Sequence, residues 1–183
     1  MSPMHLPETT RRVFLNRTLQ ALGAAAVLPL ASAGFADATQ DDGNPAVPKL
    51  VFLGPGEYAT LDAVGDALIP AGGAFEIGAR DVDLARRIDS HLPRMDPGVA
   101  TGFRGALAFI EKEAPGLAGK QAPFSALGES DRAAVLTAML QGDGLSRGVF
   151  TATKYVCLVH FYTIDETWQF TGYDGPMLLE GVQ

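Results

Sequence analysis

The chain has 183 residues, of which 47% are hydrophobic, and a formal net charge of -7 at pH 7. A chain of this length suits one folded domain with its own hydrophobic core. Its acidic balance repels phosphate backbones, so nucleic acid is excluded as an expected partner. The one cysteine, Cys157, excludes an intrachain disulfide, an iron–sulfur cluster and a zinc site built from this chain's own thiolates.

Residues 1–33 have the three parts of an export signal peptide. A positively charged start precedes an apolar segment over about residues 19–30, and Ala31 and Ala33 fit the small-residue cleavage rule. The segment is interrupted by Gly23 and Pro29 and is too short and weakly apolar to cross a bilayer as a helix. We therefore predict a cleaved signal peptide, with an uncleaved membrane anchor as the alternative.

The motif "TRRVFLN" at residues 10–16 resembles the S/T-R-R-x-F-L-K signal of the bacterial twin-arginine pathway, through Arg11, Arg12, Phe14 and Leu15. The resemblance implies that the twin-arginine translocase exports this protein to the periplasm in a folded state. Cargo of that pathway is usually folded beforehand because a cofactor is inserted in the cytoplasm. An ordinary Sec signal whose positive region contains two arginines is the alternative.

Residues 34–49 ("GFADATQDDGNPAVPK") have little apolar content and several turn formers, which predicts a flexible linker. The folded domain is predicted over residues 50–183. Apolar residues there recur at helical spacing, without the sustained alternation that marks strands. The expected fold class is therefore all-α, with one compact domain of about five helices and an irregular, aromatic C-terminal tail.

Three helices are predicted in the first half of this domain, over residues 55–69, 84–92 and 97–114. Proline at the first helical position or just beyond the last one marks their ends. Each has apolar residues at intervals of three and four, which place one apolar stripe along its length. The glycine- and proline-rich residues 115–128 are predicted to form a loop.

Two further helices are predicted in the second half. One begins at Glu129, where acidic residues favour the positive end of the helix dipole, and ends at Gly142. The other covers residues 147–164, which are apolar on nearly every side, as expected of a helix that the others surround at the centre of the core. Its β-branched and aromatic residues leave a strand as the alternative, although its length exceeds that of ordinary strands. A helical turn over residues 165–170 then precedes the irregular tail.

Few residues suit catalysis. Cys157 and His160 lie three positions apart and could form half of a metal site, but no second pair of ligands accompanies them. A buried thiol and a hydrogen-bonded histidine are the favoured interpretation, and a metal-dependent enzyme is an alternative. His91 is expected to be a cation at a helix C-terminus. Gly54 and Gly56 lack the third glycine of a dinucleotide site. We therefore predict no catalytic, cofactor-binding or metal-binding residue in this chain.

Three segments resemble the gluconate 2-dehydrogenase subunit 3 family: "FLGPGEYATLDAVGDALIP" at residues 52–70, "FSALGESDRAAVLTAML" at 124–140 and "TWQFTGYDGP" at 167–176. The most distinctive positions of the first segment, here called the opening pattern, are Leu53, Glu57, Thr60, Leu61, Ala63, Asp66, Leu68, Ile69 and Pro70.

The resemblance implies a non-catalytic small subunit without a cofactor of its own. Its partner would be a large FAD-containing oxidoreductase of the glucose-methanol-choline (GMC) type that acts on a sugar, glucoside or aldonate, in some complexes with a cytochrome c subunit. The large subunit often lacks a signal, so the small one would carry it to the periplasm. This implication accounts for an export signal on a chain with no predicted cofactor site.

The tail has more aromatic residues than an irregular segment of this length needs for itself. Large aromatic side chains often anchor protein interfaces. We therefore predict that the tail docks on the flavoprotein through Trp168, Phe170, Tyr173, Pro176 and Met177. The alternative function is a free-standing periplasmic binding or stress protein without a flavoprotein partner.

Overall fold

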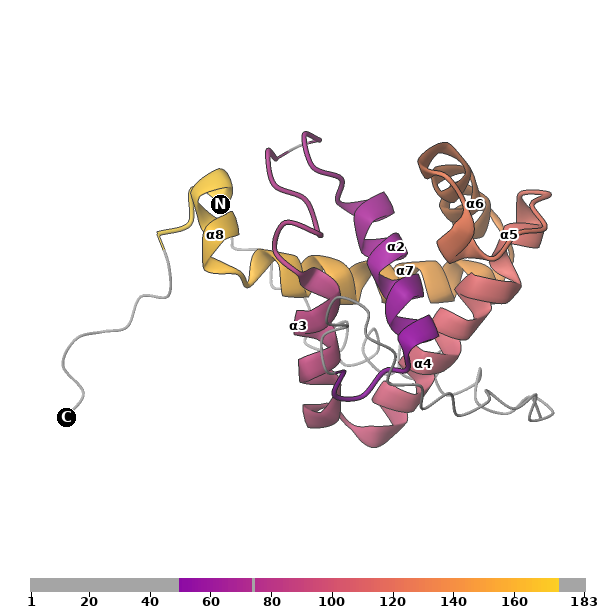
Figure 1. Cartoon of the computed structure of the whole chain (residues 1–183), viewed down its shortest axis with the longest axis horizontal. Helices are drawn as coiled ribbons and strands as arrows, with labels where there is room; N and C mark the ends of the chain where they lie inside the picture. Colours follow the sequence, from indigo (N-terminus) through magenta and orange to yellow (C-terminus); the bar gives the residue numbers. More distant parts are fainter. Residues whose placement is uncertain (1–49, 74, 175–183) are drawn as a thin grey trace, which may run out of the picture.

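The structure is a computed structural model that describes residues 50–73 and 75–174, and this part of the chain is all-helical (Figure 1). Its principal helices are α2 (Pro55–Leu68), α3 (Leu84–His91), α4 (Pro97–Lys112), α6 (Glu129–Gln141) and α7 (Gly144–Tyr162). They confirm the five predicted helices and the all-α fold class, and the strand alternative for residues 147–164 is wrong.

Several sequence predictions lie outside the described residues. They are the signal peptide over residues 1–33 with Arg11, Arg12, Phe14, Leu15, Ala31 and Ala33, the linker over residues 34–49, and the last two interface residues, Pro176 and Met177. These remain predictions.

Short-range hydrogen bonds explain where α2, α4 and α7 begin. Glu57 Oε2 accepts the backbone N–H of Gly54 at 2.8 Å, one turn before it, at the start of α2. Asp96 Oδ1 accepts from the amides of the first turn of α4. Asp143 Oδ1 accepts from the amide of Ser146 at 2.8 Å, so α7 begins at Gly144, three residues before the predicted start. Each carboxylate satisfies an amide that has no partner within its helix.

The centre of the fold is α2, not α7 as the sequence predicted. Helix α2 contacts α3, α4, α6 and α7, and it crosses in front of α7 in Figure 1. Helix α7 runs along the length of the molecule and packs its inner side against the other helices, including the short α8 (Asp165–Thr171) at its far end. Its opposite side is open to solvent, so the prediction that the other helices surround it is wrong.

The predicted loop over residues 115–128 contains two short helical elements. These are α5 (Ala114–Leu117) and the 3-10 helix η3 (Phe124–Ala126), while another 3-10 helix, η2 (Leu92–Arg94), follows α3 at the expected proline stop. The side chain of Phe124 is fully buried in the core. Burying a Phe side chain contributes on the order of 2 kcal/mol, which holds this turn-rich segment against the domain.

Asp89 fastens the start of the described chain to α3. Its buried carboxylate accepts the backbone N–H groups of three consecutive residues, Val51 at 2.7 Å, Phe52 at 3.0 Å and Leu53 at 2.7 Å. Three such bonds compensate the carboxylate for its lost hydration. The chain therefore enters the domain along a fixed path immediately before α2.

Candidate functional site

The structure separates the described residues of the predicted tail interface. Trp168 and Tyr173 lie together, with ring centroids 5.2 Å apart in an edge arrangement, and Trp168 Nε1 donates to the carbonyl of Tyr162 at the end of α7. Phe170 instead contacts Phe75, with centroids 5.6 Å apart. Tyr173 is exposed, and Trp168 and Phe170 are both half-buried. Trp168 and Tyr173 therefore remain available to a partner as a pair, whereas the ring of Phe170 lies against Phe75.

Helix α7 presents a second apolar surface that the sequence analysis missed. We name it the α7 strip and define it as Tyr155, Leu158, Val159 and Tyr162. The exposed fractions of Tyr155, Val159 and Tyr162 are 64%, 40% and 43%, and Leu158 is half-buried. The sequence does contain an indication of this exposed side: the polar Thr151 lies four residues before Tyr155, on the same side of the helix. A polar residue at this position indicates that the side faces solvent, and the residues that follow on the same side, in the last turns of α7, are apolar.

Cys157 and His160 lie on the inner side of α7. Burial raises the pKa of the Cys157 thiol to about 12, so the side chain is an un-ionised core thiol at neutral pH. His160 Nδ1 lies 2.9 Å from the carbonyl of Val156 and therefore carries the hydrogen of that bond. Burial lowers the pKa of His160, and the neighbouring His91, whose ring centroid is 5.0 Å away, lowers it further. This arrangement fits the favoured interpretation of a core thiol and a hydrogen-bonded histidine.

Two polar residues of the opening pattern join helices of the domain. Glu57 not only accepts from the amide of Gly54 but also forms an ion pair with Arg104 of α4, with Oε1 and Nε 2.8 Å apart. Thr60 Oγ1 donates to Glu111 Oε2 at 3.0 Å. The same carboxylate accepts from the amide and hydroxyl of Ser125, at 2.9 and 2.6 Å. Glu111 thus ties α2 and η3 to α4.

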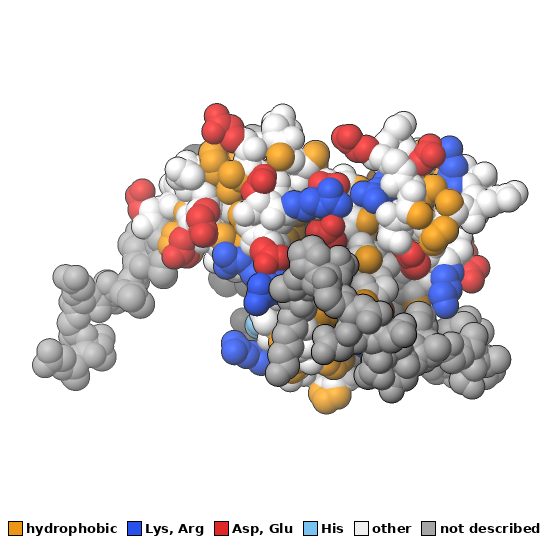
Figure 2. Space-filling model, viewed as in Figure 1, with side chains coloured by type: hydrophobic (Ala, Val, Ile, Leu, Met, Phe, Trp, Pro, Cys, Tyr) orange, Lys and Arg blue, Asp and Glu red, His pale blue; other side chains and the backbone are white. Residues whose placement is uncertain are grey.

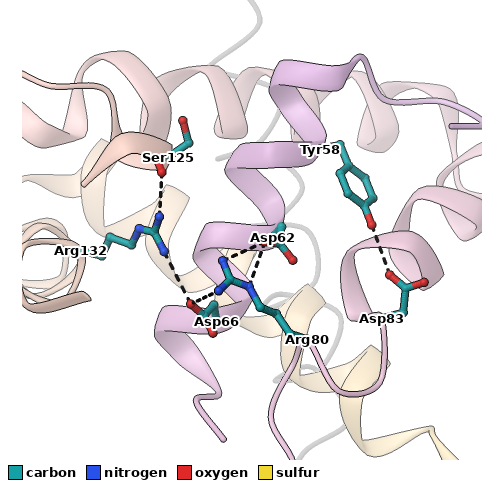
Figure 3. A network of polar contacts seen from close by, with 7 residues as sticks. All are labelled: Tyr58, Asp62, Asp66, Arg80, Asp83, Ser125 and Arg132. Atoms are coloured by element: carbon teal, nitrogen blue, oxygen red, sulfur yellow. Dashed lines mark hydrogen bonds and ion pairs between the residues drawn. The ribbon is translucent and has the colours of Figure 1, made fainter. Parts of the chain in front are cut away.

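The third polar residue of the opening pattern, Asp66, belongs to a charged network on the surface (Figure 3). Arg80 lies 3.0 Å from Asp62 and 3.1 Å from Asp66, and Arg132 of α6 lies 3.6 Å from Asp66 while it donates to the carbonyl of Ser125. Acidic and basic side chains also lie next to one another on the face of the molecule that Figure 2 shows. The network joins α2, α6 and the connection between α2 and α3.

Tyr58 extends these contacts to the start of α3. Its hydroxyl donates to Asp83 Oδ1 at 3.2 Å (Figure 3). Burial, and after it the charge of Asp83, raises the pKa of Tyr58 to about 12. The tyrosine therefore stays protonated and acts as a donor at neutral pH. This contact ties α2 to the start of α3.

Residues 55–175 match the family model described as gluconate 2-dehydrogenase subunit 3. The chain belongs to this family. The match covers every helix from α2 to α8, and it confirms the resemblance that the opening pattern and the tail motif indicated. No match to this chain was found among the curated proteins or among the solved structures.

Membership of the gluconate 2-dehydrogenase subunit 3 family makes this chain a subunit of a dehydrogenase complex. Across residues 50–73 and 75–174, no group of three or more His, Cys, Asp or Glu side chains is placed to hold a metal ion. Within the same part of the chain, no helix combines the length and the apolar character needed to cross a membrane. Exposed apolar side chains that could contact another molecule include those of the α7 strip and Tyr173.

Proposed function

We propose that this chain is the non-catalytic escort subunit of a periplasmic FAD-dependent dehydrogenase that acts on a sugar, glucoside or aldonate. Its partner is a large GMC-type flavoprotein, which holds the FAD, and a cytochrome c subunit completes some complexes of this kind. The observation that carries the proposal is the family match over the helical domain. It assigns the chain to a dehydrogenase complex, and our proposal places the chemistry in another subunit of that complex.

The contacts of the opening pattern support a structural role. Its polar members Glu57, Thr60 and Asp66 each bond to another helix or to a neighbouring loop. Most of its apolar members are buried, namely Leu53, Leu61, Ala63 and Ile69. A catalytic group has to reach substrate, cofactor or reacting atoms. The most distinctive residues of this domain instead hold its own helices together.

The sequence of residues 1–33 supports the escort role. A twin-arginine signal exports folded cargo, and this chain offers no cofactor site in its described part that would itself require folding before export. Export in the folded state is explained if the chain is bound to a flavoprotein that acquires its FAD in the cytoplasm. The small subunit then carries the signal for both chains.

The test is cell fractionation after co-expression of the full chain with the large FAD-containing subunit of the same organism. With Arg11→Lys and Arg12→Lys together, we expect flavoprotein activity and antigen to remain in the cytoplasm, because the paired arginines are what the translocase recognises. Arg17→Lys, in the same signal but outside the pair, should leave export unchanged. A flavoprotein that still reaches the periplasm with the double variant contradicts the escort role.

A further inference from the structure

The α7 strip has the spacing of a helix surface made for packing. Tyr155, Leu158, Val159 and Tyr162 stand at positions i, i+3, i+4 and i+7, which lie on one side of a helix. This is the pattern by which helices usually bury a face against a neighbour. In the described part of the chain this side stays largely exposed, although the ring of Phe75 contacts that of Tyr162, with centroids 6.0 Å apart. The residues of α7 that are buried against other helices lie on its inner side and include Val149, Thr153, Cys157 and Phe161.

The strip continues into two further aromatic residues, the half-buried Trp168 of α8 and the exposed Tyr173 just after it. Tyr162, its last member, accepts through its backbone carbonyl from Trp168 Nε1, and Trp168 in turn contacts the ring of Tyr173. One surface therefore runs from Tyr155 to Tyr173. Three half-exposed tyrosines, at roughly 150–250 Å² per aromatic side chain, place a few hundred Å² of mainly apolar area on it. That is a substantial part of the ~800 Å² that each partner contributes to a stable interface.

We propose that the α7 strip, together with Trp168 and Tyr173, is the docking surface for the large FAD-containing subunit. This inference rests on the proposed function and goes beyond the tail residues that the sequence suggested. The occupant is an apolar patch of the flavoprotein with an acidic residue at one end and basic residues at the other.

The charged residues beside the strip determine which charges the partner surface should carry. Lys154 borders its beginning and lies over the ring of Phe150, 5.9 Å from the centroid, with no ion pair among the described residues. Asp165 and Asp174 border its other end, and they too form no ion pair within the described part of the chain. A partner that places a carboxylate against Lys154 and arginine or lysine against the two aspartates would be attracted at long range and would dock in one orientation along the strip. A second copy of this chain, with the same net charge of -7, is repelled at long range.

The first experiment measures how much flavin co-purifies with the tagged full chain when both subunits are expressed in a host without a twin-arginine translocase. The test variant is Tyr155→Lys with Val159→Lys. The matched control is Leu117→Lys with Leu140→Lys, since these leucines are 49% and 48% exposed on α5 and α6, away from the strip. We expect the test variant to lose at least about tenfold of the co-purified flavin, as for anchor residues at an interface centre, and the control to retain it.

Two outcomes separate the two proposals. If the unmodified chain brings down no flavin, the proposed function itself is overturned. If it brings down flavin and the strip variant does so equally well, only the docking surface is overturned. All substituted positions are exposed, so unchanged circular dichroism and thermal unfolding are expected and exclude misfolding as the cause of a loss.

A second experiment identifies what covers the strip, with Val159→Cys and a bulky maleimide as the probe. The buried Cys157 reacts slowly because its thiol stays protonated, so labelling reports on position 159. We expect rapid labelling of the free chain and at least tenfold slower labelling in the complex with the flavoprotein. Protection in the free chain overturns the proposal: if deletion of residues 175–183 relieves it, the occupant is the chain's own end, and if dilution relieves it, a second copy.

Discussion

The carboxylate of Asp89 in α3 holds the backbone amide of Leu53 at 2.7 Å, across 36 positions of sequence. The same carboxylate accepts from the amides of Val51 and Phe52. Because Leu53 lies directly before α2, this cluster determines where the segment that follows the predicted linker joins the folded domain. A buried charge with three donors is costly to remove, because the buried amide of Leu53 then loses its partner away from water and the amides of Val51 and Phe52 lose theirs in a partly buried position.

Replacement of Asp89 by alanine should therefore destabilise the domain strongly. Three amides lose their acceptor: the buried amide of Leu53 costs about 1–3 kcal/mol when left unpaired, and the part-buried amides of Val51 and Phe52 add smaller amounts. We expect the free energy of unfolding to fall by about 3 kcal/mol or more, measured by urea denaturation. Asp96→Ala, which removes only the exposed cap of α4, should cost about 1 kcal/mol. Equal losses for the two variants would contradict the anchoring role.

Gly78 is required by close packing in the connection between α2 and α3. A Cβ atom there would lie 2.8 Å from the carbonyl oxygen of Ile69 and would also meet the backbone of Pro70 and Ala71. Because these neighbours are backbone atoms, they cannot rotate away. We expect Gly78→Ala to lower the melting temperature, with a cost of about 1–3 kcal/mol, as for other overpacked sites.

Gly105, in the middle of α4, is the control for that substitution. A Cβ atom there meets nothing within 4 Å, and the residue is exposed. Gly105→Ala should raise the free energy of unfolding by about 0.5–1 kcal/mol, since alanine is the better helix former. Stabilisation by both alanine variants would refute the packing argument at Gly78.

His160 should make the stability of the domain depend on pH. Its pKa in the folded state is lowered, mainly by burial, so the unfolded chain binds a proton at a pH where the folded chain does not. Stability is therefore lost as the pH falls through the ordinary histidine pKa of about 6.5, and the loss stops growing below the lowered pKa. We expect the difference in unfolding free energy between pH 7.5 and pH 5 to shrink in His160→Gln. An unchanged difference would show that other groups cause it.

Trp168 and Tyr173 should contribute to partner binding without holding the domain together. Tyr173 is exposed, and outside its own helix Trp168 contacts the ring of Tyr173 and the last turn of α7. With Trp168→Ala and Tyr173→Ala together, we expect the co-purified flavoprotein to fall by roughly tenfold or more. Phe170→Ala, which removes the contact with Phe75, should instead lower the melting temperature. Undiminished co-purification with the double variant would remove the tail from the interface.

The sequence alone determined the helices and the family. Proline and glycine at the ends of apolar stripes are local signals, and they placed the principal helices within a few residues of their observed bounds. The opening pattern and the tail motif pointed to the gluconate 2-dehydrogenase subunit 3 family, which the family model confirmed. Both inferences depend on residues that are close together along the chain.

Only the tertiary structure decided which faces of the helices are buried. Residues 147–164 are apolar on nearly every side, and the pattern cannot distinguish a helix enclosed by its own domain from one that keeps a face for another molecule. The packing of the helices shows that α7 is not enclosed by its own domain. The residues of the α7 strip, from Tyr155 to Tyr162, remain accessible to solvent. Asp89 likewise reads as an ordinary surface acid, because its three amide donors lie 36 to 38 positions away along the chain. Contacts at such distances arise from the way the helices pack, and local periodicity carries no information about them.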